Sequence, residues 1–408
     1  MGLRSKGEGS MRFDVERALT RSEAVLALKS GWKLNVAEEL VDVRRSCGRV
    51  LARDCFARYD LPRHRVSAMD GIAVRSADFA DGMPDTSAWV RGVDFAQADT
   101  GDDFPDAFDA VVAIENVAFD EGDRLRFLED LKVEAGRSVK PAGATMRAEE
   151  LLYPQGTLVD PFSAAILAAG GWGEVPVIAR PKVAFIPTGT ELVPVGVEPQ
   201  RGENVETNSL MLSALFEQWG ADTVVYDIVV DDKEKLAETL DRALSEADIV
   251  LINGGSSCGS EDFNSFLLQE RASWFAHGVK AVPGRPIGMA LIEGKPAVNV
   301  PGPMIAAALA ADWLIRGLIL HYLGRPMPQR QRVSAVLDNA LSGRPGFEML
   351  ARLVTREVDG VLHAASVPSG STLAENIRAV DAFLAVPADV RFEKGDVVEV
   401  ELLGTVTR

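Results

Sequence analysis

The chain has 408 residues, of which 47% are hydrophobic and 25% are charged. A single core stops growing well below this length, so we expect several domains. The formal net charge of −17 argues against broad binding to nucleic acid or to anionic membranes, because these surfaces repel an acidic protein. No window approaches the roughly 20 consecutive apolar residues of a membrane span, and the first ten residues lack the apolar core of a signal peptide. We therefore expect a cytoplasmic protein with neither a nucleic-acid partner nor a membrane partner.

The cysteines and histidines indicate neither a disulfide framework nor a zinc site. Cys47, Cys55 and Cys258 are odd in number and lack the paired spacing of metal ligands. The four histidines are equally scattered. This pattern disfavours catalysis by a Cys-His pair and a histidine-bound metal.

The N-terminal part of the chain predicts a helical domain that a β-rich module interrupts. From Phe13 to Leu51, apolar residues recur near helical spacing. Residues 57–150 instead carry short apolar runs between turns rich in Gly, Pro and Asp, which predicts a β-rich module. Helical character returns over residues 151–171. We therefore assign residues 11–56 and 151–180 to one helical domain and residues 57–150 to the inserted module.

Residues 181–325 predict an α/β domain. Short apolar runs, typical of buried strands, occupy residues 183–186, 223–230, 249–252 and 297–300. Between the first two runs, the side chains that share one helix face are Leu212, Leu215, Phe216 and Trp219. Gly220 then stands where a helix commonly ends, and Asp231 or Asp232 can cap the next helix. This alternation predicts a parallel sheet covered on both faces.

Residues 326–408 predict an all-β domain. Asp359-Gly360 stands between two β-rich runs, as in a hairpin turn. Residues 396–403 alternate apolar and polar side chains, as expected for a half-buried strand.

Three loops of the α/β domain follow predicted strands, and ligands of open parallel sheets bind beyond these strand ends. They span residues 188–192, 253–262 and 301–303. The middle loop combines Gly254 and Gly255 with Ser256 and Ser257, so close backbone approach and hydroxyl donors predict a cradle for an anion. The alternative is an ordinary glycine-rich turn in which Asp262 caps a helix.

Three carboxylates fall just beyond strand ends at the same edge of the predicted sheet. They belong to Glu191, Asp231 and Asp262. Carboxylates that converge near a phosphate favour Mg²⁺, which prefers oxygen ligands. The alternative is that each acid caps or solvates its own helix.

Two turns could also carry functional groups. Pro283-Gly284-Arg285-Pro286 holds a cation between rigid residues, which suits an oxyanion, although a plain surface turn is the alternative. Asp70 lies in the turn Ser67-Ala68-Met69-Asp70-Gly71, where it is either a catalytic group or a turn former.

Seven motifs, in this order, resemble those of the molybdopterin molybdotransferase family, which includes the bacterial MoeA proteins and the E domain of gephyrin. They are Gly48-Arg49-Val50-Leu51-Ala52, Ser67-Ala68-Met69-Asp70-Gly71, Thr100-Gly101, Thr188-Gly189-Thr190-Glu191-Leu192, Gly254-Gly255 with Asp262, Pro283-Gly284-Arg285-Pro286, and Pro301-Gly302. The resemblance runs from about residue 13 to the C-terminus.

The resemblance implies an elongated homodimer of four-domain chains: the interrupted helical domain with its β module, a molybdopterin-binding α/β domain and a C-terminal β-barrel. In this family the active site lies between the α/β domain of one subunit and the β module of the other. The implied reaction is Mg²⁺-dependent cleavage of adenylylated molybdopterin, with transfer of molybdate to the dithiolene and release of AMP. Molybdoenzymes or cofactor-handling proteins are the protein partners to expect.

The resemblance also implies roles for individual residues. The catalytic positions are Asp70, Thr100, Glu191 and Asp262, and the metal-binding positions are Glu191, Asp231 and Asp262. The substrate-binding positions are Thr188, Gly189, Asn208, Gly254, Gly255, Ser256, Ser257, Gly284, Pro286, Pro301 and Gly302. The oxyanion-binding positions are Arg285, Ser371 and Arg352.

The chain departs from the family pattern at charged positions. Thr145 replaces an acidic residue, and Gly278 and Val282 replace lysines. The leading hypothesis is an active transferase for molybdate or tungstate. A weakened paralogue that binds the pterin nucleotide as a scaffold or cofactor-handling protein is the first alternative. An unrelated Mg²⁺-dependent nucleotide hydrolase on a similar α/β domain is the second.

Overall fold

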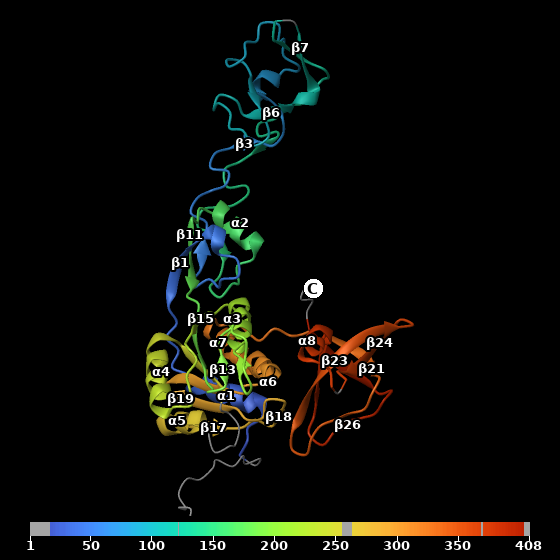
Figure 1. The fold of residues 1–408 in the computed structure, drawn as a ribbon. Helices are drawn as coiled ribbons and strands as arrows, with labels where there is room; N and C mark the ends of the chain where they lie inside the picture. Colours follow the sequence, from blue (N-terminus) through green and yellow to red (C-terminus); the bar gives the residue numbers. More distant parts are fainter. Residues whose placement is uncertain (1–16, 121, 255–262, 369, 404–408) are drawn as a thin grey trace, which may run out of the picture. The chain divides into compact units, whose positions relative to one another are not determined.

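The computed structural model describes residues 17–120, 122–254, 263–368 and 370–403. The chain divides into two compact units (Figure 1). The small unit spans Glu38–Ile178, and the large unit combines Met1–Ala37 with Ala179–Arg408. In sequence, the small unit is therefore an insertion into the large unit.

One core of the small unit lies between a strand pair and a helix. β1 (Glu38–Asp42) pairs antiparallel with β11 (Glu174–Ile178). Val175 of this pair packs with Leu167 of α2 (Pro161–Ala169) in a buried cluster. The ladder and the helix together give residues from both ends of the unit a common core.

A second core of the small unit belongs to its β-rich region. β4 (Gly71–Val74) lies between β5 (Ala96–Ala98) and β6 (Ala110–Ala113), and all four of its residues are buried. Ile72 packs there with Phe95. The other strands of the small unit are β2 (Cys55–Phe56), β3 (Val66–Ser67), β7 (Val117–Asp120), β8 (Arg124–Phe127), β9 (Val139–Lys140) and β10 (Leu151–Tyr153).

The predicted helices of the N-terminal region are partly wrong. α1 (Arg21–Gly31) is helical and starts with a capping box formed by Thr20 and Glu23. Residues 38–42, however, form β1, and residues 151–153 form β10. Strand pairing across the small unit overrides the helix-like spacing of the apolar residues in these segments. In β1 this pairing leaves the side chain of Leu40 56% exposed. A helix-like apolar pattern therefore did not mark a buried helix face here.

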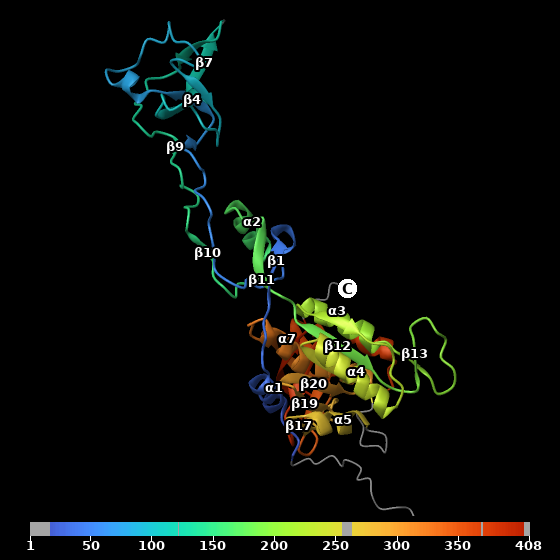
Figure 2. The ribbon, with the colours of Figure 1, turned by 90° about the vertical axis from the view of Figure 1, so that its left-hand side faces the viewer.

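The large unit contains a six-stranded sheet in the order β15-β12-β16-β20-β19-β17. Figure 2 labels β12, β20, β19 and β17 of this sheet. These strands are β12 (Lys182–Pro187), β15 (Asp222–Val225), β16 (Ile249–Asn253), β17 (Trp274–His277), β19 (Gly288–Ile292) and β20 (Lys295–Val300). The parallel sheet that we predicted is confirmed for β15, β12, β16 and β20. The other edge is antiparallel, because Glu293-Gly294 is a two-residue hairpin turn and a parallel crossover needs a far longer connection.

Helices cover both faces of this sheet. α4 (Lys233–Glu246) and α5 (Phe263–Arg271) bury leucines against Ala184 and Ile186 of β12. On the other face, Leu212 and Phe216 of α3 (Asn208–Trp219) are fully buried. The predicted helix boundaries hold here: Gly220 ends α3 in a left-handed conformation with φ 95°, and Asp232 caps α4.

One helix of the large unit is long and apolar enough to cross a membrane. It spans Met304–Tyr322 and comprises α6 (Met304–Ala310), a π-helical segment (Ala311–Ile315) and α7 (Arg316–Tyr322). Most of this helix is buried inside the unit. It is therefore a core helix of this unit.

The C-terminal part of the large unit is a closed five-stranded β-barrel, as the resemblance implied. The ring runs β23-β24-β21-β27-β25 and closes through the pairing of β25 with β23. Its strands are β21 (Arg332–Leu337), β23 (Glu348–Val358), β24 (Val361–Ser366), β25 (Ala382–Val386) and β27 (Val397–Leu402). The predicted Asp359-Gly360 turn joins β23 to β24, with both residues at positive φ. Shorter elements beside the barrel are β18 (Ala281–Val282), β22 (Leu341–Ser342), β26 (Arg391–Phe392) and α8 (Leu373–Ala379).

Candidate active site

A cavity of about 400 Å³ lies where the parallel strands of the large unit end. It is lined by Thr188, Glu191, Leu192, Asn204, Val205, Glu206, Thr207, Asn208, Asn253, Gly254, Gly302, Pro303, Met304 and Leu373. Thr188 follows β12, Gly254 follows β16 and Gly302 follows β20. The ends of three predicted strands therefore lie at one cavity, as expected because ligands of open parallel sheets bind beyond the carboxyl ends of the strands.

Buried amide side chains hold two of these strand ends together. The amide nitrogen of Asn208 donates to Asn253 Oδ1 at 2.8 Å and to the Gly302 carbonyl at 2.7 Å. The amide nitrogen of Asn253 donates in turn to the Pro301 carbonyl at 2.9 Å. Both hydrogen bonds donated by the Asn208 amide go to protein acceptors. Asn208 therefore contributes to the predicted substrate site by fixing the loop after β20.

A second buried amide fixes the loop after β16. Asn264, which is 4% exposed, donates to Thr188 Oγ1 at 2.9 Å and to the Gly254 carbonyl at 2.8 Å. Gly254 itself has φ 124°, and a Cβ at this position would lie 2.2 Å from the Thr188 carbonyl oxygen. Only glycine fits this approach. Gly255, Ser256, Ser257 and Asp262, which the sequence assigned to the anion cradle, lie outside the described residues.

Two of the three predicted metal-binding carboxylates lie beside the loop after β12. The carboxylate of Glu191 is so close to Gly189 that a Cβ there would lie 2.5 Å from Oε2. Asp231 accepts hydrogen bonds from the Thr190 amide at 3.2 Å and hydroxyl at 2.9 Å. No cluster of three metal-binding side chains occurs among the described residues, to which Asp262 does not belong.

The donor chemistry of this loop fits Mg²⁺. Within the described part of the chain, the Glu191 carboxylate makes no hydrogen bond or ion pair, and one oxygen of Asp231 is equally uncommitted. Hard carboxylate oxygens of this kind are the usual protein ligands of Mg²⁺.

The Pro283–Pro286 turn lies outside the residues that line the cavity. Gly284 is buried, with φ 106°, and Arg285 is exposed with its guanidinium carbon 5.8 Å from the Phe347 ring centre. At the two positions where lysines are usual, Gly278 donates its N–H to the Ile287 carbonyl and Val282 pairs with Met349. Neither can replace the missing charge.

Arg352 and Ser371, the other predicted oxyanion-binding residues, share a partner in the barrel domain. The guanidinium of Arg352 donates to Asn376 Oδ1 at 3.0 Å, and the Asn376 amide nitrogen donates to the Ser371 carbonyl at 3.0 Å. Burial lowers the pKa of Arg352. This network gives Arg352 a fixed direction.

The small unit holds the remaining pair of predicted catalytic residues. Thr100 donates to one carboxylate oxygen of Asp70 through its amide and through its hydroxyl, both at 2.7 Å. These two bonds hold the pKa of Asp70 below its ordinary value, the amide bond being the larger cause. Thr145 is exposed and donates its N–H to the Leu61 carbonyl.

The sequence-based prediction of the site did not include several polar residues that build it. Asn253 and Asn264 carry the buried amide network, and Glu206, which is 8% exposed, accepts hydrogen bonds from Ser209 at the start of α3. A polar residue directly after a buried strand was the available signal for Asn253. For Asn264, the second residue of α5, no local signal separated it from a surface residue.

A mostly parallel sheet with a polar cavity at its carboxyl edge defines an α/β protein of the class that binds small molecules beyond its strand ends. Family models match the MoeA N-terminal region (domains I and II) over residues 13–171, the probable molybdopterin binding domain over residues 184–321, and the MoeA C-terminal region (domain IV) over residues 334–403.

Individual relatives agree with these matches. The chain is 32% identical to a molybdopterin molybdenumtransferase from Nostoc, over 70% of this chain and 69% of that protein. It is 29% identical to molybdopterin molybdenumtransferase 2 from Mycobacterium tuberculosis, over 86% and 91%. The crystal structure of a molybdopterin biosynthesis MoeA protein from Pyrococcus horikoshii superposes with a TM-score of 0.76 at 25% identity, covering 94% of this chain and 99% of that one. The chain therefore belongs to the MoeA family of molybdopterin molybdenumtransferases in molybdenum cofactor biosynthesis, which confirms the resemblance in its sequence.

Proposed function

We propose that this protein inserts molybdate into adenylylated molybdopterin in a Mg²⁺-dependent reaction that releases AMP. The observation that carries the proposal is the cavity at the sheet edge, which the Glu191 carboxylate lines together with Thr188, Gly254 and Gly302 from the ends of three strands. A carboxylate that makes no hydrogen bond or ion pair in the described part of the chain suits a cation that bridges to a phosphate. The names of the Nostoc and M. tuberculosis relatives support the same reaction.

In this proposal, the residues divide the chemistry between binding and activation. Glu191 and Asp231, with Asp262, hold Mg²⁺, which neutralises charge on the phosphoanhydride when bound. Thr188, Gly189, Gly254, Pro301 and Gly302 position the substrate, together with Gly255, Ser256, Ser257, Gly284 and Pro286. Asp70, whose carboxylate is held in place by two hydrogen bonds from Thr100, accepts a proton or orients the incoming oxyanion.

The oxyanion is assigned to the cations of the large unit. Arg285 keeps a positive charge that suits molybdate or tungstate, and Arg352, which Asn376 orients, adds a second cation beside Ser371. We further propose a cytoplasmic homodimer in which Asp70 of one subunit works with Glu191 of the other. Molybdoenzymes or cofactor-handling proteins receive the product.

A catalytically weakened paralogue is the second candidate. Thr145, Gly278 and Val282 carry no charge where the family pattern has acids or lysines, and the bonds of Gly278 and Val282 are those of backbone structure. Such a protein would bind the nucleotide without releasing AMP.

The test is AMP release from adenylylated molybdopterin by the purified full chain, with Mg²⁺ and with molybdate or tungstate. We expect Glu191→Gln to lower the rate at least about a hundredfold, as when one preorganised electrostatic contact is lost. Glu198→Gln is the matched control, because Glu198 is exposed in the connection between β13 (Leu192–Val193) and β14 (Asn204–Val205), shortly after Glu191, and does not line the cavity. Tight nucleotide binding without AMP release would reject the transferase in favour of the weakened paralogue.

A further inference from the structure

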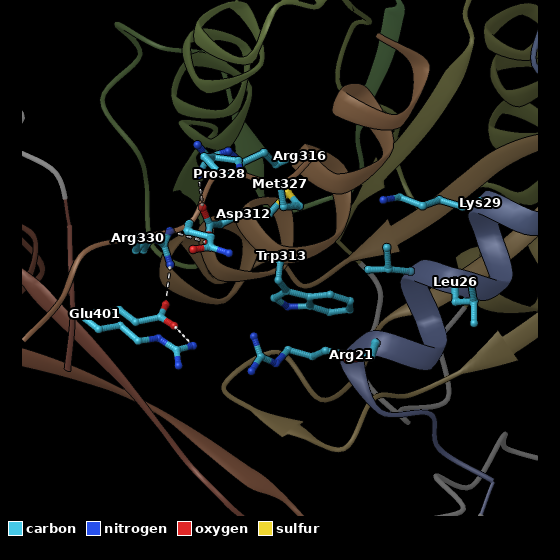
Figure 3. Close-up of a pocket in the computed structure, with 14 residues that line it drawn as sticks. Arg21, Leu26, Lys29, Asp312, Trp313, Arg316, Met327, Pro328, Arg330 and Glu401 are labelled. Atoms are coloured by element: carbon cyan, nitrogen blue, oxygen red, sulfur yellow. Dashed lines mark hydrogen bonds and ion pairs between the residues drawn. The ribbon is translucent and has the colours of Figure 1, made fainter. Parts of the chain in front are cut away.

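A second cavity in the large unit has no part in the proposed reaction. It has a volume of about 950 Å³ and shares no lining residue with the cavity at the sheet edge. Its walls come from α1, from the Met304–Tyr322 helix, from the segment that leads into the barrel and from the barrel strands β21 and β27 (Figure 3). This volume lies within the range of small-molecule sites.

The cavity is cationic, although the chain carries a net charge of −17. Its lining cations are Arg21, Lys29, Arg316, Arg330 and Arg332, against the carboxylates of Asp312 and Glu401. Arg330 contacts Asp312 at 2.7 Å, and Arg332 contacts Glu401 at 3.0 Å (Figure 3). These ion pairs neutralise the barrel side of the cavity.

Two lining cations keep unused charge or donors. Among the residues that the structure describes, Lys29 has no carboxylate within ion-pair distance, although burial lowers its pKa. Arg316 has a 3.4 Å contact with Asp312, and its guanidinium carbon lies 5.6 Å from the Trp219 ring centre. A half-buried ammonium without a carboxylate partner is costly unless an anion meets it.

Apolar side chains stand beside these cations. Leu26 of α1 is 66% exposed and Met327 is 39% exposed, and both line the cavity with Val25 and Trp313. Leu26 and Lys29 are three residues apart, so they project from neighbouring positions on one helix face. An anion held by Lys29 would therefore bring an attached apolar group against this wall.

We propose that this cavity binds a small phosphorylated molecule whose apolar or planar part lies against Leu26 and Met327 while Lys29 and Arg316 hold the phosphate. The inference does not depend on the proposed transferase reaction, because the site shares no residue with it. It assigns a ligand site, of nucleotide-like chemistry, to the junction of α1 with the barrel.

Calorimetric titration of the full chain with pyrophosphate and with ATP, in the presence of EDTA, tests the site. We expect saturable binding of both, with ATP tighter because its base covers the apolar wall. Lys29→Gln and Arg316→Gln should each weaken both ligands about tenfold or more, since each removes a charge-assisted contact. Leu26→Ser should weaken ATP and leave pyrophosphate unchanged.

Two controls separate this site from general charge and from the reaction cavity. Lys33→Gln makes the same charge change four residues beyond Lys29, outside the lining, and should leave binding unchanged. Glu191→Gln should lower AMP release without lowering pyrophosphate affinity. Absence of saturable binding, or equal weakening by Lys33→Gln and Lys29→Gln, would overturn the proposal and leave the transferase assignment untouched.

Discussion

A single neighbour, Thr100, lowers the pKa of Asp70. The amide of Thr100 and, to a smaller extent, its hydroxyl stabilise the ionised form and lower the pKa of Asp70. In Thr100→Val the amide bond remains and the hydroxyl bond is lost, so we expect the pKa of Asp70 to rise toward its ordinary value. Because Asp70 then becomes protonated at higher pH, the acid limb of the kcat/KM profile should move to higher pH.

Carbon-detected NMR titration of the Asp70 carboxyl, beside the rate profile, measures this change. Asp85 is an internal control, because Ser87 lowers the pKa of Asp85 in the same way through its amide and hydroxyl. An acid limb that stays in place while the pKa of Asp70 rises would show that Asp70 does not control the rate.

At the level of single residues, the sequence predicted positions better than roles. Thr188, Glu191, Gly254 and Gly302 line one cavity because the ends of parallel strands meet at one edge of a sheet. Asn208 also lines it, yet its amide is consumed by protein partners. Such partners come from loops far apart in the sequence, which no local pattern reveals.

At the level of elements, β4 requires glycine at its first position. A Cβ on Gly71 would lie 2.0 Å from the carbonyl oxygen of Val112 in the neighbouring strand β6. We expect Gly71→Ala to destabilise the protein by roughly 1–3 kcal/mol, because the backbone of a paired strand must shift. Hydrogen exchange of the amides in β4 to β6 measures the effect locally, and urea unfolding measures it globally.

Gly173→Ala is the matched control for this substitution. Gly173 lies in the same unit, and no atom lies within 4 Å of a Cβ built on it. Its replacement should leave the free energy of unfolding unchanged or slightly raised, because alanine restricts the unfolded chain. Equal loss of protection in both variants would mean that the close approach at Gly71 has no special cost.

The secondary structure was predictable where one pattern had one structural solution. The apolar run at 249–252 became β16, and Gly220 ended α3, because a buried strand and a left-handed helix end have specific sequence requirements. The helix predicted over Glu38–Asp42 was wrong, because these residues form a strand by pairing with β11, more than 130 residues away. The antiparallel edge of the sheet was missed for a similar reason, since the Glu293-Gly294 turn decides the direction of β19 and β20 together.

At the scale of the whole molecule, the groups to which we assign catalytic and metal-binding roles are divided between two units. Asp70 and Thr100 belong to the small unit, whereas Glu191, Asp231 and the sheet-edge cavity belong to the large unit. If each active site is formed by the small unit of one subunit and the large unit of the other, substitutions in the two units can be placed on different chains of one dimer. One site of such a dimer stays free of both substitutions. A symmetric dimer then contains two equivalent composite sites.

Complementation between inactive variants tests this arrangement. Asp70→Asn and Glu191→Gln should each lose AMP release, but a heterodimer of the two contains one site in which both residues are wild type. Random mixing during co-expression makes about half of the dimers mixed, so about a quarter of wild-type activity should return. If instead both residues served a site within one chain, every site would carry a substitution and the mixture would stay inactive. Purifying the mixed dimer with two different affinity tags makes the comparison sharper, because its activity should then approach about half of the wild-type value.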